Sequence, residues 1–361
     1  MRILTHTLIL LTALTGQAQL SVGDSISTDI LYDYLEGTNV VIENVSWDCD
    51  SASIATFQYT GSNLDSNEGL LMTTGTAIGA TGPNNTGAQF GGPDGFGNSD
   101  SDLEIATGQN MNDVCILEFD ITPDFGILLF DYVFGSEEYP EFVDSFNDGF
   151  LFLVSGPGIE GPYSSPFPEG SENFCIIPGT ELPVTINNLN NGNDGINGPC
   201  MNCEYYIHNG SGSEAPYDSD STYVQYDGLT TQLLGNVTVT PGETYHVKIV
   251  IGDALDTAYD SGIFIQKQGF RSVQALGIEA ALGTDVILFP NPLQDHLSIE
   301  GLESGMYELR FTDELGRTVL SESIRIDGQL QMDISDLDAG SYLMIIKDSS
   351  GQSGYQRIIK R

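Results

Sequence analysis

The stretch GSEEYPEFVDSFNDGF, residues 135–150, is rich in carboxylates and contains no Lys or Arg. Its acids are Glu137, Glu138, Glu141, Asp144 and Asp148. A pair of carboxyls about 5 Å apart, or somewhat further, can hydrolyse a glycoside. A larger group can bind calcium, which takes roughly six to eight oxygen ligands. The remaining alternative is an acidic face that is simply solvated.

Two further acidic groups adjoin predicted strand ends, so a rigid scaffold could bring them to the same place as this stretch. None of the three groups has the spacing of an EF-hand loop. The predicted calcium ligands are Asp100, Asp102, Glu137, Glu138, Asp148, Asp253, Asp256 and Asp260. The alternative is that these acids cap turns and face solvent. Bound Ca²⁺ is therefore a hypothesis at this point.

A catalytic role has less support. Glu137 and Glu138 are adjacent and would point to opposite faces of a strand, so Glu138 with Asp148 is the candidate hydrolytic pair. Trp47 is the only Trp, which argues against a sugar-binding groove lined by aromatic rings. His246 alternates within a predicted strand and is interpreted as a satisfied sheet residue. No Gly-x-Ser-x-Gly or His-Glu-x-x-His motif is present. We therefore expect a protein that is not an enzyme.

The elements that must position these acids are almost all strands. Segments 81–102 and 187–203 have the composition of long loops. Only segment 25–37 has a partly helical pattern, with Thr28 as the predicted cap and Gly37 as the stop. Short runs rich in β-branched and aromatic residues lie at 116–121, 127–134, 149–155 and 244–253. The sequence predicts an all-β fold with a large β-sandwich or jelly-roll-like domain.

The N-terminus has the pattern of a secretory signal peptide, residues 1–18. Arg2 precedes a short apolar run, and small residues lead to a predicted cleavage after Ala18. The run is too short for a permanent membrane anchor, and no later apolar stretch approaches the length that spans a bilayer. No transmembrane segment is therefore predicted.

The net charge is −40. Lys248, Lys267 and Arg271 are the only Lys or Arg residues between positions 19 and 275, so this part is strongly acidic. Such a charge repels nucleic acid and anionic membranes. Residues 276–285 have the composition of a linker, and residues 286–361 have hairpin signals and more bases. We predict that they form a small immunoglobulin-like β-sandwich.

The five cysteines fit an exported chain, in which disulfides persist. Cys200 and Cys203 are three residues apart in a loop, and they are predicted to form a local disulfide. Zinc is not favoured, since no second such pair or set of His ligands accompanies them. The pairing of Cys49, Cys115 and Cys175 is open from the sequence.

The last 76 residues, 286–361, resemble the type A C-terminal sorting domain of the Bacteroidota type IX secretion system. Three motifs carry the resemblance: LFPNP at 288–292, LDAGSYLMII at 337–346 and QRIIKR at 356–361. The resemblance assigns a sorting role to Pro290, Asn291, Pro292, Gly340, Tyr342, Lys360 and Arg361. It implies handling by the type IX secretion machinery and removal of this domain. The product is then either released or attached to lipopolysaccharide.

Residues 19–275 are similar to the choice-of-anchor L domain, most clearly over 100–270. The motifs include FDYVFGSEEYPEFVDSFNDGFLFLVSGPG at 130–158 and TPGETYHVKIVIGDALDTAYDSGIFI at 240–265. The resemblance implies an extracellular domain on the cell surface and assigns no activity. Cys175 stands where a small apolar residue is expected.

These observations favour a secreted or cell-surface adhesion or ligand-binding module that calcium stabilises. Tyrosines cluster beside a polar loop, which suits contact with a surface glycan or a protein ligand. They are Tyr205, Tyr206, Tyr217, Tyr223 and Tyr226. The alternatives are an extracellular polysaccharide hydrolase that uses Glu138 and Asp148, and a structural component of the cell envelope or matrix.

Overall fold

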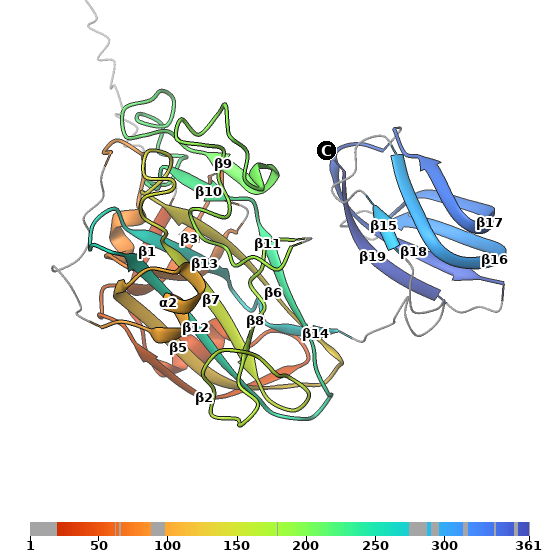
Figure 1. The fold of residues 1–361 in the computed structure, drawn as a ribbon, viewed down its shortest axis with the longest axis horizontal. Helices are drawn as coiled ribbons and strands as arrows, with labels where there is room; N and C mark the ends of the chain where they lie inside the picture. Colours follow the sequence, from red (N-terminus) through yellow and green to blue (C-terminus); the bar gives the residue numbers. More distant parts are fainter. Residues whose placement is uncertain are drawn as a thin grey trace, which may run out of the picture. The chain divides into compact units, whose positions relative to one another are not determined.

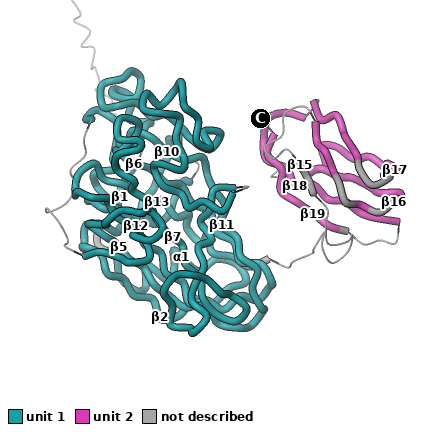
Figure 2. The backbone as a smooth tube through the Cα atoms, viewed as in Figure 1, with its two compact units in different colours: residues 1–273 teal, residues 274–361 magenta. Residues whose placement is uncertain are grey.

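The fold comes from a computed structural model, which divides the chain into two compact units, Met1–Val273 and Gln274–Arg361 (Figure 2). The structure describes residues 20–61, 63–64, 66–87, 98–178, 180–273, 287–289, 296–312, 317–335, 337–349 and 353–360. The predicted signal peptide, 1–18 with its cleavage site Ala18, and the predicted linker, 276–285, lie outside these residues.

Two antiparallel sheets build the first unit (Figure 1). Among the described residues, nine strands form the one that we call the large sheet. Its strands, in order, are β1 (Leu20–Ser25), β3 (Ile54–Tyr59), β4 (Glu68–Thr73), β13 (Ser261–Gln266), β6 (Ile127–Ser136), β10 (Gly228–Thr230) and β9 (Tyr206–His208), while β11 (Leu233–Thr238) and β14 (Arg271–Val273) also pair with β6. Strand β6 therefore lies at the centre of the sheet.

The other sheet, which we call the small sheet, has five described strands. In order they are β2 (Val40–Asp48), β5 (Met111–Pro123), β12 (Tyr245–Ala254), β7 (Gly149–Ser155) and β8 (Glu172–Asn173). The main core packs side chains of both sheets together, for example the stacked rings of Phe130 and Phe152 with centroids 4.0 Å apart. This face-to-face packing makes the first unit a β-sandwich.

Parts of the outer faces of both sheets are also apolar, where loops and short helices cover them. In β12, Ile249 and Ile251 join the main core, while Val250 joins a cluster on the outer face. Strand alternation produces this division. Helix α2 (Ser101–Thr107) adds Leu103 to the outer cluster. This explains why the central strands are nearly continuous apolar runs.

Two short helices modify the sequence-based expectations. Helix α1 (Thr28–Leu35) forms where it is predicted, but Ser27 caps it instead of Thr28, since the Ser27 hydroxyl accepts from the Ile30 amide. Helix α2 begins inside the segment expected to be a loop, and Asp100 caps it. Two 3₁₀ turns, η1 (Ala77–Ala80) and η2 (Cys203–Tyr205), lie in connections.

The second unit has its own core and its own sheet. Its described strands are β15 (Ile287–Phe289), β16 (His296–Thr312), β17 (Thr318–Asp333), β18 (Gly340–Asp348) and β19 (Ser353–Lys360). Strands β16 and β17 curl through register shifts. The Tyr342 hydroxyl donates to the Asp338 carbonyl at 2.7 Å, so this motif residue stabilises the turn before its strand. Pro290, Asn291, Pro292 and Arg361 lie outside the described residues.

Both parts of the predicted fold class are confirmed. The first unit is a large β-sandwich, and the second is a small immunoglobulin-like one.

Two disulfides lie in the first unit. One joins Cys49, after β2, to Cys115 in β5, and the other joins Cys200 to Cys203. Cys175 is a buried free thiol, which answers the pairing question.

The Cys49–Cys115 disulfide should stabilise the protein more than the local one. It closes a loop with a sequence separation of 66, against 3 for Cys200–Cys203. Chain entropy then gives about 4 kcal/mol for the long loop and roughly 2 kcal/mol for the short one. We expect denaturant unfolding of the Cys49→Ala/Cys115→Ala variant to show the larger loss. Equal losses in the matched Cys200→Ala/Cys203→Ala variant would contradict this.

Candidate metal centre

Three buried carboxyl groups meet at one end of the sandwich. Glu138 lies two residues after β6, Asp148 immediately precedes β7, and Asp253 lies in β12. All three residues are 0% exposed. Asp148 and Asp253 continue the alternation of Phe150 and Ile251, which belong to the core between the sheets. We call these three residues the inner cluster.

Asp148 connects the two sheets at this end. Its Oδ1 accepts from the Ala254 amide of β12 at 2.8 Å, and its Oδ2 accepts from the Ser261 hydroxyl of β13 at 2.7 Å. The Ser261 hydroxyl also lies 2.8 Å from the Ser136 hydroxyl, which accepts from the Glu138 amide at 2.9 Å. The positions of Glu138 and Asp148 are thus tied to one network.

The other two members of the inner cluster have unsatisfied oxygens. Both carboxyl oxygens of Glu138 and both of Asp253 are buried without a hydrogen-bond partner. Across the described residues, no ion pair reaches Glu138, Asp148 or Asp253. An unpaired buried charge is costly, and each buried unsatisfied polar group calls for an explanation such as a bound ion.

The pKa values of the inner cluster also show that burial opposes the charged form of these carboxyl groups. Burial, followed by the charges of Asp148 and Asp256, raises the pKa of Glu138 to about 10. Burial raises the pKa of Asp148 to about 7. Burial and the Asp148 charge raise the pKa of Asp253 well above its usual value. Protons would cancel the charge and would let Asp253 hydrogen-bond to Asp148, but both oxygens of Glu138 would still lack partners, whereas a cation would satisfy both requirements.

The spacing limits how an ion could be held. In the part of the chain that the structure describes, no three carboxyl groups have oxygens all within 4.8 Å of one another. Calcium ligands lie about 2.3–2.6 Å from the ion, and carbonyl oxygens and water are among them. An ion in the inner cluster would therefore combine carboxylates with backbone, hydroxyl or water oxygens, or draw the carboxylates inward.

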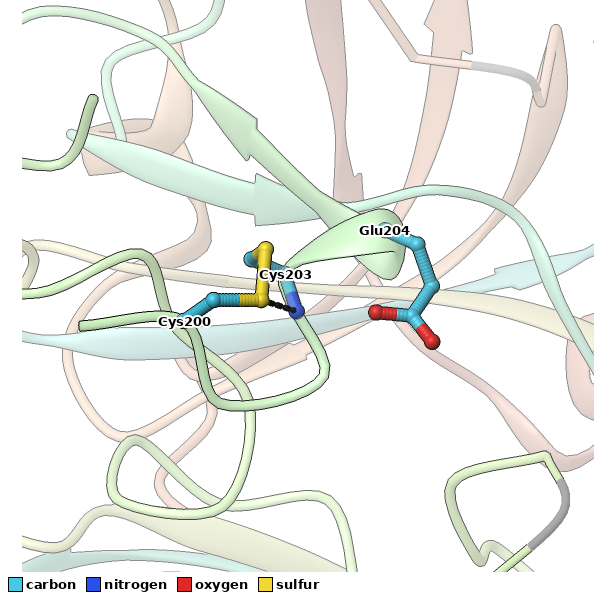
Figure 3. Close-up of side chains that lie close together, drawn as sticks. All are labelled: Cys200, Cys203 and Glu204. Carbon is cyan, nitrogen blue, oxygen red and sulfur yellow. Dashed lines mark hydrogen bonds between the residues drawn. A yellow bond between two sulfur atoms is a disulfide. The ribbon is translucent and has the colours of Figure 1, made fainter. Parts of the chain in front are cut away.

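One group of side chains does meet the 4.8 Å spacing: Cys200, Cys203 and Glu204 (Figure 3). The two sulfurs are bonded to each other at 2.00 Å. A disulfide offers no thiolate, which is the form of Cys that binds metal. This group is therefore not a metal site.

The predicted ligands do not all converge. Asp256 is half-buried in the loop after β12, and its carboxylate accepts from the Ala258 amide at 3.1 Å. Glu137 and Asp260 are buried at the end of the large sheet, beside Asp227, which no sequence motif identifies. Its position next to Glu137 depends on strand register, which the sequence did not reveal.

Asp100 and Asp102 have a different environment, so the structure separates them from the inner cluster. The Lys248 ammonium lies 2.5 Å from Asp100 Oδ2 and 2.9 Å from Asp102 Oδ2. Burial alone would raise the pKa of Asp102, but hydrogen bonds from Ser164 and the Lys248 charge hold it below its usual range. One lysine therefore pairs with both carboxylates, a partner that the inner cluster does not have in the described structure.

Lys248 also lines a pocket of about 670 Å³ on the outer face of the small sheet. His246 lies between two carboxylates there, with Nδ1 2.9 Å from Asp120 and Nε2 3.3 Å from Glu118. The lining consists of Glu118, Asp120, Leu153, Ser155, Ser164, Ser165, Pro166, Phe167, Ser171, His246 and Lys248. Serine hydroxyls, two carboxylates, the His246 imidazole and the Phe167 ring therefore line the same pocket.

A β-sandwich with buried acids at its loop end, followed by a small β-sandwich, defines a two-unit all-β protein. The choice-of-anchor L domain model matches residues 22–271, and the chain belongs to this family. The secretion system C-terminal sorting domain model matches residues 287–361. The protein is exported by type IX secretion and is found at the cell surface or released.

Comparison with solved structures gives only weak similarities. A DUF3244 family protein from Bacteroides vulgatus, with an immunoglobulin-like β-sandwich fold, is 18% identical over 20% of this chain and 81% of its own, with a TM-score of 0.18. Latent PorU from Porphyromonas gingivalis is 14% identical, with 68% and 18% covered and a TM-score of 0.19. A Ruminococcus gnavus β-glucuronidase is 8% identical, with 69% and 34% covered and a TM-score of 0.22.

This chain thus spans about a fifth of PorU and a third of the β-glucuronidase. Such TM-scores carry no information on function. No curated protein matches the chain. Within the described residues, no helix has the length and apolar character needed to cross a membrane.

Replacing Lys248 should lower the free energy of unfolding, because it leaves Asp100 and Asp102 buried without their cation. The side chains of Asp100 and Asp102 are 8% and 4% exposed. Lys248→Met keeps the length of the side chain but removes its charge, and we expect a loss of about 3–5 kcal/mol in the free energy of unfolding. Lys267→Met is the control, because its partners Asp33 and Glu68 are more exposed and the loss should stay below about 1 kcal/mol. Similar losses for the two variants would contradict the conclusion that Lys248 compensates the buried charges of Asp100 and Asp102.

Proposed function

We propose that the first unit is a cell-surface adhesion or ligand-binding module without enzymatic activity, stabilised by calcium bound at the inner cluster. Glu138, Asp148 and Asp253 would supply the carboxylate ligands. The observation that carries the proposal is that Glu138 and Asp253 are fully buried with four carboxyl oxygens that have no partner.

Calcium fits the donor set better than other common ions. The inner cluster offers oxygen donors, which suit a hard cation, and has no Cys or His of the kind that selects zinc. Calcium also tolerates irregular geometry and takes backbone carbonyls, whereas magnesium demands a near-ideal octahedron and keeps its waters. Asp256, half-buried nearby, adds negative charge that raises the pKa of Glu138.

A calcium ion here would fasten the loop end of the sandwich. Glu138 belongs to the turn after β6 of the large sheet, while Asp253 belongs to β12 of the small sheet. An ion shared by them would cross-link the sheets beside the hydrogen bonds of Asp148. Because such a site is absent from the unfolded chain, its binding free energy adds to stability. Rigidly held loops are what a recognition surface requires.

A hydrolytic role for Glu138 and Asp148 has no support from accessibility. Both residues are 0% exposed, so a polysaccharide could not reach them. The pocket near Lys248 is accessible, but His246 contacts both of its neighbouring carboxylates, Glu118 and Asp120. Hydroxyls, carboxylates and a ring suit the binding of a polar ligand such as a surface glycan or a protein segment.

Calcium should raise the melting temperature of the purified protein, and magnesium at equal ionic strength should not. An ion that binds only the folded state adds about 2.7 kcal/mol at a hundred times its dissociation constant. For a unit of this size the midpoint should rise by roughly 5–10 °C. The Glu138→Gln variant keeps the shape of the side chain but should show a smaller rise than the unaltered protein.

The Asp144→Asn variant is the matched control, since Asp144 is an exposed acid in the same turn. It should respond to calcium as the unaltered protein does. An equal response to calcium and magnesium would indicate charge screening alone. That outcome, or no response to either ion, would remove calcium from the proposal.

Binding of the protein to an array of bacterial surface polysaccharides tests the recognition role. We expect Phe167→Ala, which removes the ring from the pocket, to lower binding at least tenfold without changing the melting temperature. Trp47→Ala is the control, because Trp47 is 37% exposed and does not line the pocket. Failure to bind any glycan or protein ligand would favour a structural component of the envelope.

A further inference from the structure

A second group of acids forms a row at the end of the large sheet. Ser136, the last residue of β6, pairs with β10 on one side and with β13 on the other. One position further, the same register places Asp227 and Asp260 on either side of Glu137. The Glu137 amide confirms this on one side, since it donates to the Asp260 carbonyl at 3.0 Å. Residues directly opposite on antiparallel strands project from the same face and lie about 4.5–5.5 Å apart at Cβ.

The row lies on the opposite face of the sheet from the inner cluster. A Cβ added at Gly135 would contact Leu229 and Tyr226, which belong to the cluster on the outer face. Glu137 is two residues further on and shares that face, because side chains alternate along a strand. Glu138, the next residue, projects from the opposite face, which packs against the small sheet. Asp227, Glu137 and Asp260, which we call the outer row, are therefore a separate group.

The outer row is buried, and Glu137 and Asp227 both have carboxyl oxygens without a hydrogen-bond partner. Glu137 is 0% exposed, and neither of its carboxyl oxygens has a hydrogen-bond partner. Asp227 is 0% exposed, and its Oδ1 accepts from Asn84 at 2.7 Å while its Oδ2 has no partner. Among the described ion pairs, none includes Glu137 or Asp227. Asp260 is 4% exposed.

The neighbouring strand leaves room for these carboxylates. A Cβ added at Gly75 would lie 1.7 Å from Asp260 Oδ2, so only glycine permits the carboxylate at this position. Beside Asp227, the buried Asn209 donates from its backbone amide to the backbone carbonyl of Asp227 at 2.9 Å. Burial and the Asp227 charge raise the pKa of Glu137, as expected when carboxyl groups lie close together in a buried place.

We propose that the outer row binds a second divalent cation, of the calcium class, through Glu137, Asp227 and Asp260. All the donors are oxygens, and the ion would complete its shell with backbone, amide or water oxygens. It would hold the segment 205–227 against the sheet, and this segment carries the partly exposed Tyr217 and Tyr223. The inference rests on the proposed function only for the choice of ion.

Native mass spectrometry of the purified full chain, equilibrated with calcium, counts the bound ions. We expect two ions in the unaltered protein, one in Glu138→Gln, one in Asp227→Asn and none in the double variant. Asp227→Asn keeps an oxygen that can accept from Asn84. Glu137→Gln is a second variant of the row and should also retain one ion. Asp124→Asn, at an exposed acid elsewhere, should retain two.

The possible counts separate the two proposals. Two ions in both Asp227→Asn and Glu137→Gln would overturn the second site. A single ion in the unaltered protein that only Glu138→Gln removes would also overturn it, while leaving the inner site intact. A single ion lost in either Glu138→Gln or Asp227→Asn would mean one shared site. No bound ion in the unaltered protein would overturn both proposals.

Discussion

The need to compensate buried negative charge dominates the loop end of the sandwich. Glu137, Glu138, Asp148, Asp227 and Asp253 are each 0% exposed, and no described ion pair reaches them. A buried charge is tolerated only when it is paired, hydrogen-bonded or neutralised by a proton. Elsewhere in the same unit, Lys248 pairs with the buried acids Asp100 and Asp102. The fold thus uses one of its few cations at the pocket and supplies none at the loop end.

Export gives this arrangement a physical context. The sorting domain directs the chain out of the cell, where calcium is more abundant than in the cytoplasm and where disulfides persist. Cys49–Cys115 and a metal site would stabilise the sandwich in complementary ways, one by limiting the unfolded chain and the other by binding the folded one. A unit stabilised in this way can carry long polar loops without losing its shape.

Much of the fold could be predicted from the sequence, because alternating apolar residues identify strands and the sorting motifs are specific. The site could be predicted only in part. Glu138, Asp148 and Asp253 lie at or next to strand ends, so the sequence could suggest that they come together. Asp227 was missed because only the register of β10 against β6 places it beside Glu137. The partner of Asp100 and Asp102 was missed because Lys248 is far away in the sequence and no local pattern links them.

A crystal structure grown with calcium, with an anomalous difference map recorded at long wavelength, tests the central claim most directly. The account predicts a peak among Glu138, Asp148 and Asp253, with carboxylate oxygens about 2.3–2.6 Å from it. A map without a peak there, in which these carboxyl groups hydrogen-bond to one another or to water, would contradict it. The acids would then be buried as neutral groups, and the stability of the loop end would depend on protons instead of a metal.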